Sequence, residues 1–240
     1  MPLAPTDFYR THLAEIHQRL LADATVSAFL SGARIRLDGI ALLAEDHFSL
    51  PFGTFSTVEL AHLLSIFNGS RVHVQAEKCG ARDDAPPGLY FTIINNRVLE
   101  NRHKNKLGII QRADADTADL FVQGLHIDHY FLRENRTPAK LGTFAFALCA
   151  VTAHLAGMGL ITLIAADGHG SSHRYVGFKV WPKFGFDAPL LAGETSGFPH
   201  LHGCRTVQDV IARDEAWWAA HGTQRRMAFD LSAHSVSWQS

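Results

Sequence analysis

Residues 124–187 decide the fold of this chain and read GLHIDHYFLRENRTPAKLGTFAFALCAVTAHLAGMGLITLIAADGHGSSHRYVGFKVWPKFGFD. Residues 124–132 alternate and carry β-branched and aromatic side chains, which predicts a strand. Residues 140–156 carry apolar side chains at helical spacing and stop at Gly157 and Gly159, which predicts a helix. Residues 160–166 are almost wholly apolar, which is typical of a buried strand.

The polar loop between the first strand and the helix predicts a binding site for an anion. Such a loop can aim its backbone N–H groups outward, and the first turn of the helix adds unpaired donors and a positive dipole end. Lys140 lies at the start of the helix, where its charge is unfavourable to the dipole. An anionic ligand would remove that conflict.

The composition indicates an ordinary globular protein. Of its 240 residues 47% are hydrophobic and 19% are charged, and the formal net charge is −1. This balance argues against a general binder of nucleic acids or membrane surfaces. Three widely spaced cysteines without a CxxC motif favour free thiols in a reducing cytosol, and the first residues lack a signal-peptide pattern, so we expect a cytoplasmic protein. Glycines divide residues 141–166 into a helix and a strand, so no membrane span is expected.

The remaining chain predicts one domain over residues 1–240, with a helical extension at 1–32 and a core at about 70–190. Asp38-Gly39 predicts a tight turn within a strand region at 34–43. Residues 48–55 read as a loop, and the spacing of Ser56 and Glu59 predicts a capped helix ending at Gly69. Further strands are expected at 72–76, 89–95, 107–112 and 227–231, and a helix after Thr206.

The order of strand, basic loop, helix, buried strand, short helix and Gly-Phe resembles the core of the GNAT superfamily of acyl-CoA-dependent N-acyltransferases. In that family the loop at the helix start carries Gln/Arg-x-x-Gly-x-Gly/Ala, whose amides hold the CoA pyrophosphate. The matching residues 137–142 read TPAKLG, in which only Gly142 is retained. Lys140 replaces the middle glycine, and Arg136 lies beside the motif.

A second resemblance lies in residues 174–186, RYVGFKVWPKFGF. Gly177, Val180 and the ending Gly185-Phe186 match the family pattern Asn-x-x-Ala-x-x-Leu-Tyr-x-x-x-Gly-Phe. The family's tyrosine, often the acid that protonates the departing thiolate, falls on Trp181. An indole cannot serve as that acid near neutral pH, so Tyr175 becomes the substitute candidate.

The resemblance implies a mixed α/β fold with a central, mostly antiparallel sheet flanked by helices. It also implies transfer of an acetyl or other acyl group from acyl-CoA to an amine acceptor, whose identity and whose oligomeric partner, if any, stay open. The implied contacts with acyl-CoA are at Tyr130, Phe131, Leu132, Arg136, Thr137, Lys140, Leu141, Gly142, Thr143, Arg174 and Trp181.

The reaction needs few catalytic groups, because acyl-CoA is already activated. The enzyme must hold the thioester beside a neutral amine, polarise the carbonyl and protonate sulfur. In the family, an exposed N–H at the strand edge, here residues 129–132, polarises the thioester, and the base comes from that strand or its neighbour. Alternation places His126 and Asp128 on one face of the strand and His129 on the other. All three are candidates for the base, with Asp128 and His129 preferred, and Tyr175 is the candidate acid.

Two other functions remain open. His126-Ile127-Asp128 is an HxD pattern, as in a non-haem iron oxygenase with His173, His200 or His202 as the distal ligand. Such a fold needs strands after HxD, whereas residues 141–155 read as a helix, so no metal site is expected. A GNAT-like domain without the family's acid could also be a non-catalytic module that binds CoA or a partner.

Overall fold

The structure, a computed structural model, describes residues 3, 5–50, 53–77, 85–99, 103–113, 120–133, 135–166, 168 and 176–239, with the backbone alone for 77, 111–113 and 120–123. The chain divides into two compact units, Met1–Gly159 and Leu160–Ser240. The predictions made for residues 79–84, 114–117 and 173–175 lie outside the described residues. That all 240 residues form one domain stays a prediction.

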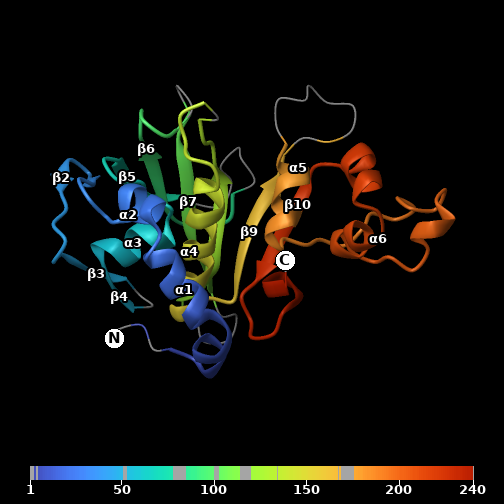
Figure 1. Cartoon of the computed structure of the whole chain (residues 1–240), viewed down its shortest axis with the longest axis horizontal. Coiled ribbons are helices and arrows are strands. Elements are labelled where there is room, and N and C mark those ends of the chain that lie inside the picture. The colour runs from blue at the N-terminus through green and yellow to red at the C-terminus, as the bar shows by residue number, and fades with distance from the viewer. Residues whose placement is uncertain are drawn as a thin grey trace. The chain divides into compact units, whose positions relative to one another are not determined.

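The first unit is a mixed α/β unit with a large sheet flanked by helices (Figure 1). Its elements in chain order are η1 (Tyr9–Leu13), α1 (Ala14–Leu21), α2 (Ala24–Leu30), β1 (Arg36–Leu37), β2 (Ile40–Ala41), β3 (His47–Leu50), β4 (Gly53–Ser56), α3 (Thr57–Leu63), β5 (Arg71–Glu77), β6 (Gly88–Ile94), β7 (Asn105–Ala113), β8 (Leu120–His129) and α4 (Leu141–Leu155). The predicted helices near residues 9–30 and 141–155 are confirmed.

The sheet of the first unit runs in the order β8-β7-β6-β5-β1-β2. Each neighbouring pair is antiparallel except β1 with β5, which is parallel. The sheet is therefore mixed and mostly antiparallel, as predicted. In Figure 1 the helices α1 to α4 lie in front of these strands. Leu107, Ile93 and Leu125 of neighbouring strands are fully buried, as are Leu63 of α3 and Leu148 of α4, and they form the core of this unit.

Local sequence signals explain several of these elements. The side chain of Ser56 accepts the backbone N–H of Glu59, and the carboxylate of Glu59 accepts the N–H of Ser56, which completes the predicted capping box of α3. Asp38 and Gly39 have φ angles of 48° and 89°, the left-handed values that a two-residue turn between β1 and β2 requires. Both predictions are confirmed at the level of single residues.

Two predictions in this region were wrong. The predicted loop at 48–55 is a two-stranded antiparallel sheet of β3 and β4, in which Phe48 pairs with Phe55 and Phe55 is fully buried. Burial of this phenylalanine outweighs the turn-forming residues between the strands. The helix predicted to reach Gly69 ends at Leu63, because Ser65 takes the left-handed conformation with φ of 50°.

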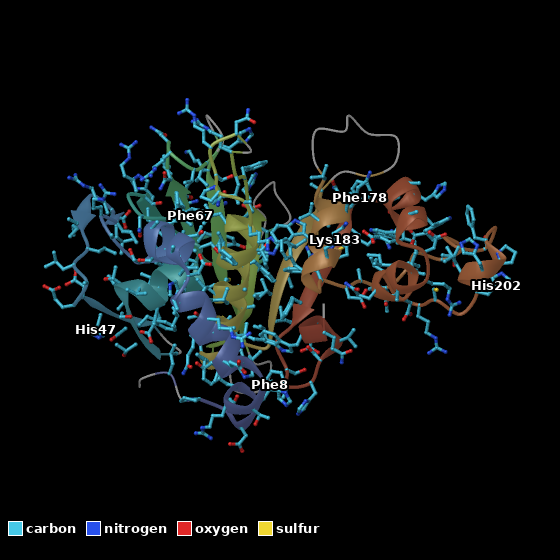
Figure 2. All side chains as sticks on the ribbon, in the orientation of Figure 1. Phe8, His47, Phe67, Phe178, Lys183 and His202 are labelled. Carbon is cyan, nitrogen blue, oxygen red and sulfur yellow. The ribbon has the colours of Figure 1, made fainter. Side chains whose placement is uncertain are left out.

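The second unit contains β9 (Leu160–Ala165), α5 (Gly177–Val180), η2 (Trp181–Phe184), η3 (Pro199–Leu201), α6 (Val207–His221), β10 (Arg225–Asp230) and η4 (Val236–Gln239). β9 and β10 pair antiparallel. Figure 2 draws the side chains, and its labelled Phe178 and Lys183 lie on the short helical segment α5–η2. Thr206 caps α6 through a box with Asp209, so the predicted cap is confirmed.

The part of the chain that the structure describes holds no helix long and apolar enough to cross a membrane. The longest described helices, α4 and α6, have 15 residues each, whereas about 20 residues are needed to span the hydrocarbon of a bilayer.

Candidate functional site

The candidate site begins at a β-bulge near the end of β8. Leu107 of β7 pairs with Ile127, but the preceding residue of β7, Lys106, pairs with His129. Asp128 is therefore the extra residue on β8, and the alternation of side chains is lost at this point. Nδ1 of His129 lies 3.2 Å from Oδ2 of Asp128. The prediction that these two side chains lie on opposite faces was wrong, because a bulge cannot be read from a period-2 pattern.

A second charged partner holds Asp128. The ammonium of Lys106 lies 3.1 Å from the same carboxylate oxygen, and the Asp128 side chain is only 8% exposed. Burial alone would raise the pKa of Asp128, but hydrogen bonds and charges from His129 and Lys106 outweigh it, so the pKa lies below its ordinary value. Lys106 also lies 5.0 Å from the centre of the Tyr90 ring. Asp128 is therefore held as a carboxylate between two basic groups.

The contact between Asp128 and His129 defines a candidate proton acceptor. When Nδ1 of His129 carries the ring proton it donates to Asp128, and Nε2 then carries the lone pair. The His129 side chain is 49% exposed, so its ring reaches the surface. The ring of Phe131 lies 6.1 Å from that of His129 and 4.2 Å from that of His103. Phe131 therefore places an aromatic ring beside the candidate base.

The predicted edge at 129–132 differs from the structure in one respect. β8 ends at His129, and the backbone N–H of Phe131 donates to Oδ1 of Asn105 at 2.7 Å. That N–H is therefore occupied. Among the described residues, the backbone N–H of Leu132 has no hydrogen-bond partner, so it is the better candidate to polarise a carbonyl.

Asn105 is a site residue that the sequence analysis missed. It is fully buried at the start of β7, and its Nδ2 has no hydrogen-bond partner among the described residues. Its role is to hold the chain after β8 through Phe131. The available signal was a polar residue two positions before the apolar run at 107–110, which is weak because asparagine is common in turns.

Hydrogen bonds to backbone carbonyl groups fix two residues of the loop between β8 and α4. The N–H of Arg133 donates to the carbonyl of Val98 at 2.8 Å, and the hydroxyl of Thr137 donates to the carbonyl of Arg133 at 2.8 Å. Arg136 and Lys140 are exposed. The loop thus has a fixed path and displays two cations to the solvent.

The start of α4 keeps the donors expected for an anion site. Lys140 is the N-cap residue with a left-handed φ of 66°, and its side chain makes no capping hydrogen bond. The N–H of Leu141 donates to the carbonyl of Pro138 at 3.2 Å. Within the described residues, no acceptor is found for the backbone N–H groups of Gly142 and Thr143. Two donors and a positive dipole end therefore remain for a ligand.

Gly142 lies against the chain that leaves β8. A Cβ atom added to Gly142 would lie 3.0 Å from Cδ1 of Leu132, so the side chain of Leu132 lies against the start of α4. Two other predicted contact residues turn their side chains inward. Leu141 is 1% exposed, and burial raises the pKa of the Tyr130 hydroxyl, which a hydrogen bond with Ser65 offsets in part. Leu141 and Tyr130 can therefore meet a ligand through the backbone alone.

Three further predicted residues are not in the described part of the first unit. Tyr175 and Arg174 fall outside the described residues, and their roles stay predictions. Trp181 belongs to the second unit, where its ring lies 5.3 Å from Phe186 and 6.0 Å from Phe184. These contacts favour a packing role for Trp181.

The iron-site alternative required strands after Asp128, and the structure has α4 at residues 141–155 instead. His200, one of the proposed distal ligands, is bonded through Nε2 to Asp214 at 3.0 Å, and His173 lies outside the described residues. No group of three or more histidine, cysteine, aspartate or glutamate side chains suited to a metal ion is found in the described part of the chain.

Comparison with protein-family models, with curated protein sequences and with solved structures found no match for this chain.

Proposed function

We propose that this protein is an N-acyltransferase that moves an acetyl or other acyl group from acyl-CoA to an amine. The observation that carries the proposal is the start of α4, where the unpaired N–H groups of Gly142 and Thr143 lie beside the exposed Lys140. Such a helix start favours a pyrophosphate. Arg136 would add a charge-assisted contact from the same loop.

The thioester would lie along the chain that links β8 to α4. The N–H of Leu132 would donate to the thioester carbonyl, and the side chain of Leu132 lies against Gly142, where the pyrophosphate would bind. Donation to the carbonyl oxygen stabilises the negative charge that develops when the amine attacks. This gives Leu132 the polarising role that the sequence analysis assigned to residues 129–132 as a group.

The Asp128–His129 pair would supply the base. The amine nitrogen forms a bond to the acyl carbon, Nε2 of His129 takes the proton that the nitrogen loses, and the bond from carbon to sulfur breaks. The departing thiolate receives a proton from Tyr175 or from water. Asp128 keeps the imidazole oriented, because it accepts the hydrogen on Nδ1.

The test is a calorimetric titration of acetyl-CoA against wild type, Gly142→Asp and Gly142→Ala. Gly142 has no positive φ, and an added Cβ meets only the flexible end of Leu132, so both variants should fold. Aspartate in the first turn stabilises a helix through its dipole, so loss of binding in Gly142→Asp would not come from unfolding. We expect binding to be abolished in Gly142→Asp and retained in Gly142→Ala.

Equal affinity of acetyl-CoA for wild type and Gly142→Asp would remove the site from this loop. Absence of binding to wild type would overturn the acyltransferase proposal itself. Binding to wild type with no release of free CoA across a panel of small amines, polyamines and lysine peptides would favour a non-catalytic CoA-binding module. A thiol-reactive dye measures that release directly.

A further inference from the structure

A surface pocket of about 340 Å³ lies at one end of the sheet of the first unit, where β1 and β5 begin and β6 ends. Its volume is near the lower end of the range of about 300–1,000 Å³ that small-molecule sites occupy. Its polar lining comes from Arg34, Arg71, Arg97, Asn68, Asn95 and Asn96. We call it the arginine pocket.

The positive charge of the arginine pocket is not compensated. No carboxylate lines the pocket, and within the described residues the guanidinium groups of Arg34, Arg71 and Arg97 form no hydrogen bond or ion pair. The guanidinium of Arg97 lies over the ring of Phe29, with Cζ 5.2 Å from the ring centre. By contrast, the side chain of Arg225 is paired with Glu194. Three like charges that share one pocket repel each other unless an anion joins them.

One asparagine fixes the backbone beside Arg34. The side chain of Asn68 accepts the N–H of Ala33 at 3.0 Å and donates to the carbonyl of Ala28 at 3.0 Å. The N–H of Gly69 donates to the carbonyl of Ala33 at 2.9 Å. The residue before Arg34 is thus held on both of its polar backbone atoms, which sets the direction from which the arginine enters the pocket.

A second asparagine fixes the other side of the pocket. Asn95 is 6% exposed, and its Oδ1 accepts the N–H of Arg97 at 3.0 Å. Its Nδ2 donates to the carbonyl of Asn68 at 3.1 Å and to the hydroxyl of Ser70, the residue before Arg71, at 3.0 Å. The two asparagines therefore join the three chain segments that carry the arginines. Positioning the donors in advance lowers the entropy cost of binding.

We propose that the arginine pocket binds a small phosphate-bearing molecule with at least two negative charges. Guanidinium groups match the geometry of phosphate oxygens through paired N–H donors, and three of them suit a di- or polyanion better than a single carboxylate. A nucleic acid is disfavoured, because the pocket is small and the net charge of the chain is −1. None of the residues that line the arginine pocket belongs to the proposed acyl-CoA site.

The experiment is a calorimetric titration with sodium pyrophosphate at low ionic strength and pH 7.5. We expect saturable binding to wild type, and affinity at least about tenfold weaker in Arg71→Gln and in Arg97→Gln, since a charge-assisted hydrogen bond is removed in each. Arg71→Lys keeps the charge but loses the paired donors, so it should show an intermediate affinity. Arg205→Gln removes the same charge from an exposed position in the second unit and should bind as wild type does.

Further variants separate the two anion sites. Gly142→Asp removes the proposed anion site at α4, so the binding that Arg71→Gln weakens should persist in this variant, whereas complete loss of pyrophosphate binding in Gly142→Asp would place pyrophosphate at α4 alone and overturn the inference. Equal affinity in wild type and Arg71→Gln would also overturn it. A parallel titration with citrate tests the ligand class, because tighter binding of citrate than of pyrophosphate would assign the pocket to polycarboxylates and contradict the choice of phosphate.

Discussion

The side chains of Asp128 and His129 meet, with Oδ2 of Asp128 3.2 Å from Nδ1 of His129. Adjacent residues in a regular strand point to opposite faces, so this contact depends on the bulge at Asp128. The same oxygen of Asp128 lies 3.1 Å from Nζ of Lys106. One carboxylate thus holds a basic group from each of two neighbouring strands at the end of the sheet.

Asp128→Asn should make the free energy of unfolding less dependent on pH in the acid range. The pKa of Asp128 in the folded protein lies below the ordinary value of 3.8, because His129 and Lys106 outweigh burial. Its contribution to stability is therefore fully present above pH 3.8 and is lost as the pH falls through the lower folded value. Urea unfolding of wild type and Asp128→Asn between pH 2.5 and 7 measures this difference, with the variant less stable by about 1–3 kcal/mol at pH 7.

A double-mutant cycle with Lys106→Gln gives the control. If Lys106 and Asp128 act as a pair, the double variant should lose less stability than the sum of the two single variants. Strict additivity would mean that the 3.1 Å contact contributes nothing, and Lys106 would then have no part in lowering the pKa of Asp128.

Gly108→Ala should destabilise the first unit. A Cβ atom at Gly108 would lie 2.4 Å from the ring of Tyr90, which is fully buried and whose hydroxyl donates to the carbonyl of Pro86 at 2.6 Å. Burial and the hydrogen bond of the hydroxyl prevent the ring from moving away. Overpacking should therefore cost about 1–3 kcal/mol in the free energy of unfolding. Chemical denaturation measures the cost.

The control for this substitution is Gly197→Ala. Gly197 has no atom within 4 Å of an added Cβ and no positive φ, so its free energy of unfolding should change by no more than about 0.5 kcal/mol. Adding Tyr90→Val to Gly108→Ala should recover part of the loss, because the smaller side chain leaves room for the methyl group. A larger loss in the double variant than in both singles combined would argue against steric conflict.

Local chemistry in the sequence was sufficient to predict several elements of the fold. Ser56 with Glu59, Thr206, and Asp38-Gly39 each specify a cap or a turn through contacts within a few residues. The helix at 141–155 follows from a long apolar pattern. The strands β3 and β4 were missed because they depend on the burial of Phe55, which is a tertiary effect. The proline and glycine in this short segment favour a loop when the sequence is read alone.

The candidate site was predictable only in part. The unpaired N–H groups at Gly142 follow from any helix start, so sequence was enough to propose them. The contact of Asp128 with His129 needed the pairing register of β7 and β8, and the role of Asn105 needed its partner Phe131. The arginine pocket joins residues 34, 71 and 97, which are adjacent only after folding.

Leu148→Ala should be among the more costly substitutions in α4. Leu148 is fully buried in the first unit, so its truncation removes apolar contacts and leaves a cavity. We expect a loss of about 2–5 kcal/mol in the free energy of unfolding. Leu191→Ala serves as the matched control, because Leu191 is 60% exposed and its truncation should change stability by less than about 0.5 kcal/mol. Similar losses in the two variants, measured by denaturant titration, would contradict the placement of α4 in the core.

The last prediction concerns His62, a buried histidine that joins α3 to α2. Its Nε2 donates to the carbonyl of Leu30 at 3.0 Å, and its side chain lies in the core at 4% exposure. Burial lowers the pKa of His62 from 6.5 to about 4, although the contact with Leu30 and the charge of Glu59 act in the opposite direction.

The sign of the effect follows from proton binding. Between pH 6.5 and about 4 the unfolded chain protonates His62 whereas the folded chain keeps it neutral, so stability falls as the pH falls through this window. From pH 7 to pH 5 the contribution of His62 to the loss should be about 2 kcal/mol. The other histidines titrate too, so the informative quantity is the difference between wild type and a variant that lacks this group.

His62→Gln is that variant, because an amide can still donate to the carbonyl of Leu30 but does not titrate. Urea unfolding at pH 7 and pH 5 should show a loss of stability about 2 kcal/mol smaller in His62→Gln than in wild type. His47→Gln, at an exposed histidine of the same unit, should lose as much as wild type. If His62→Gln and wild type lose the same stability between these pH values, His62 is not the buried neutral group that its contacts imply.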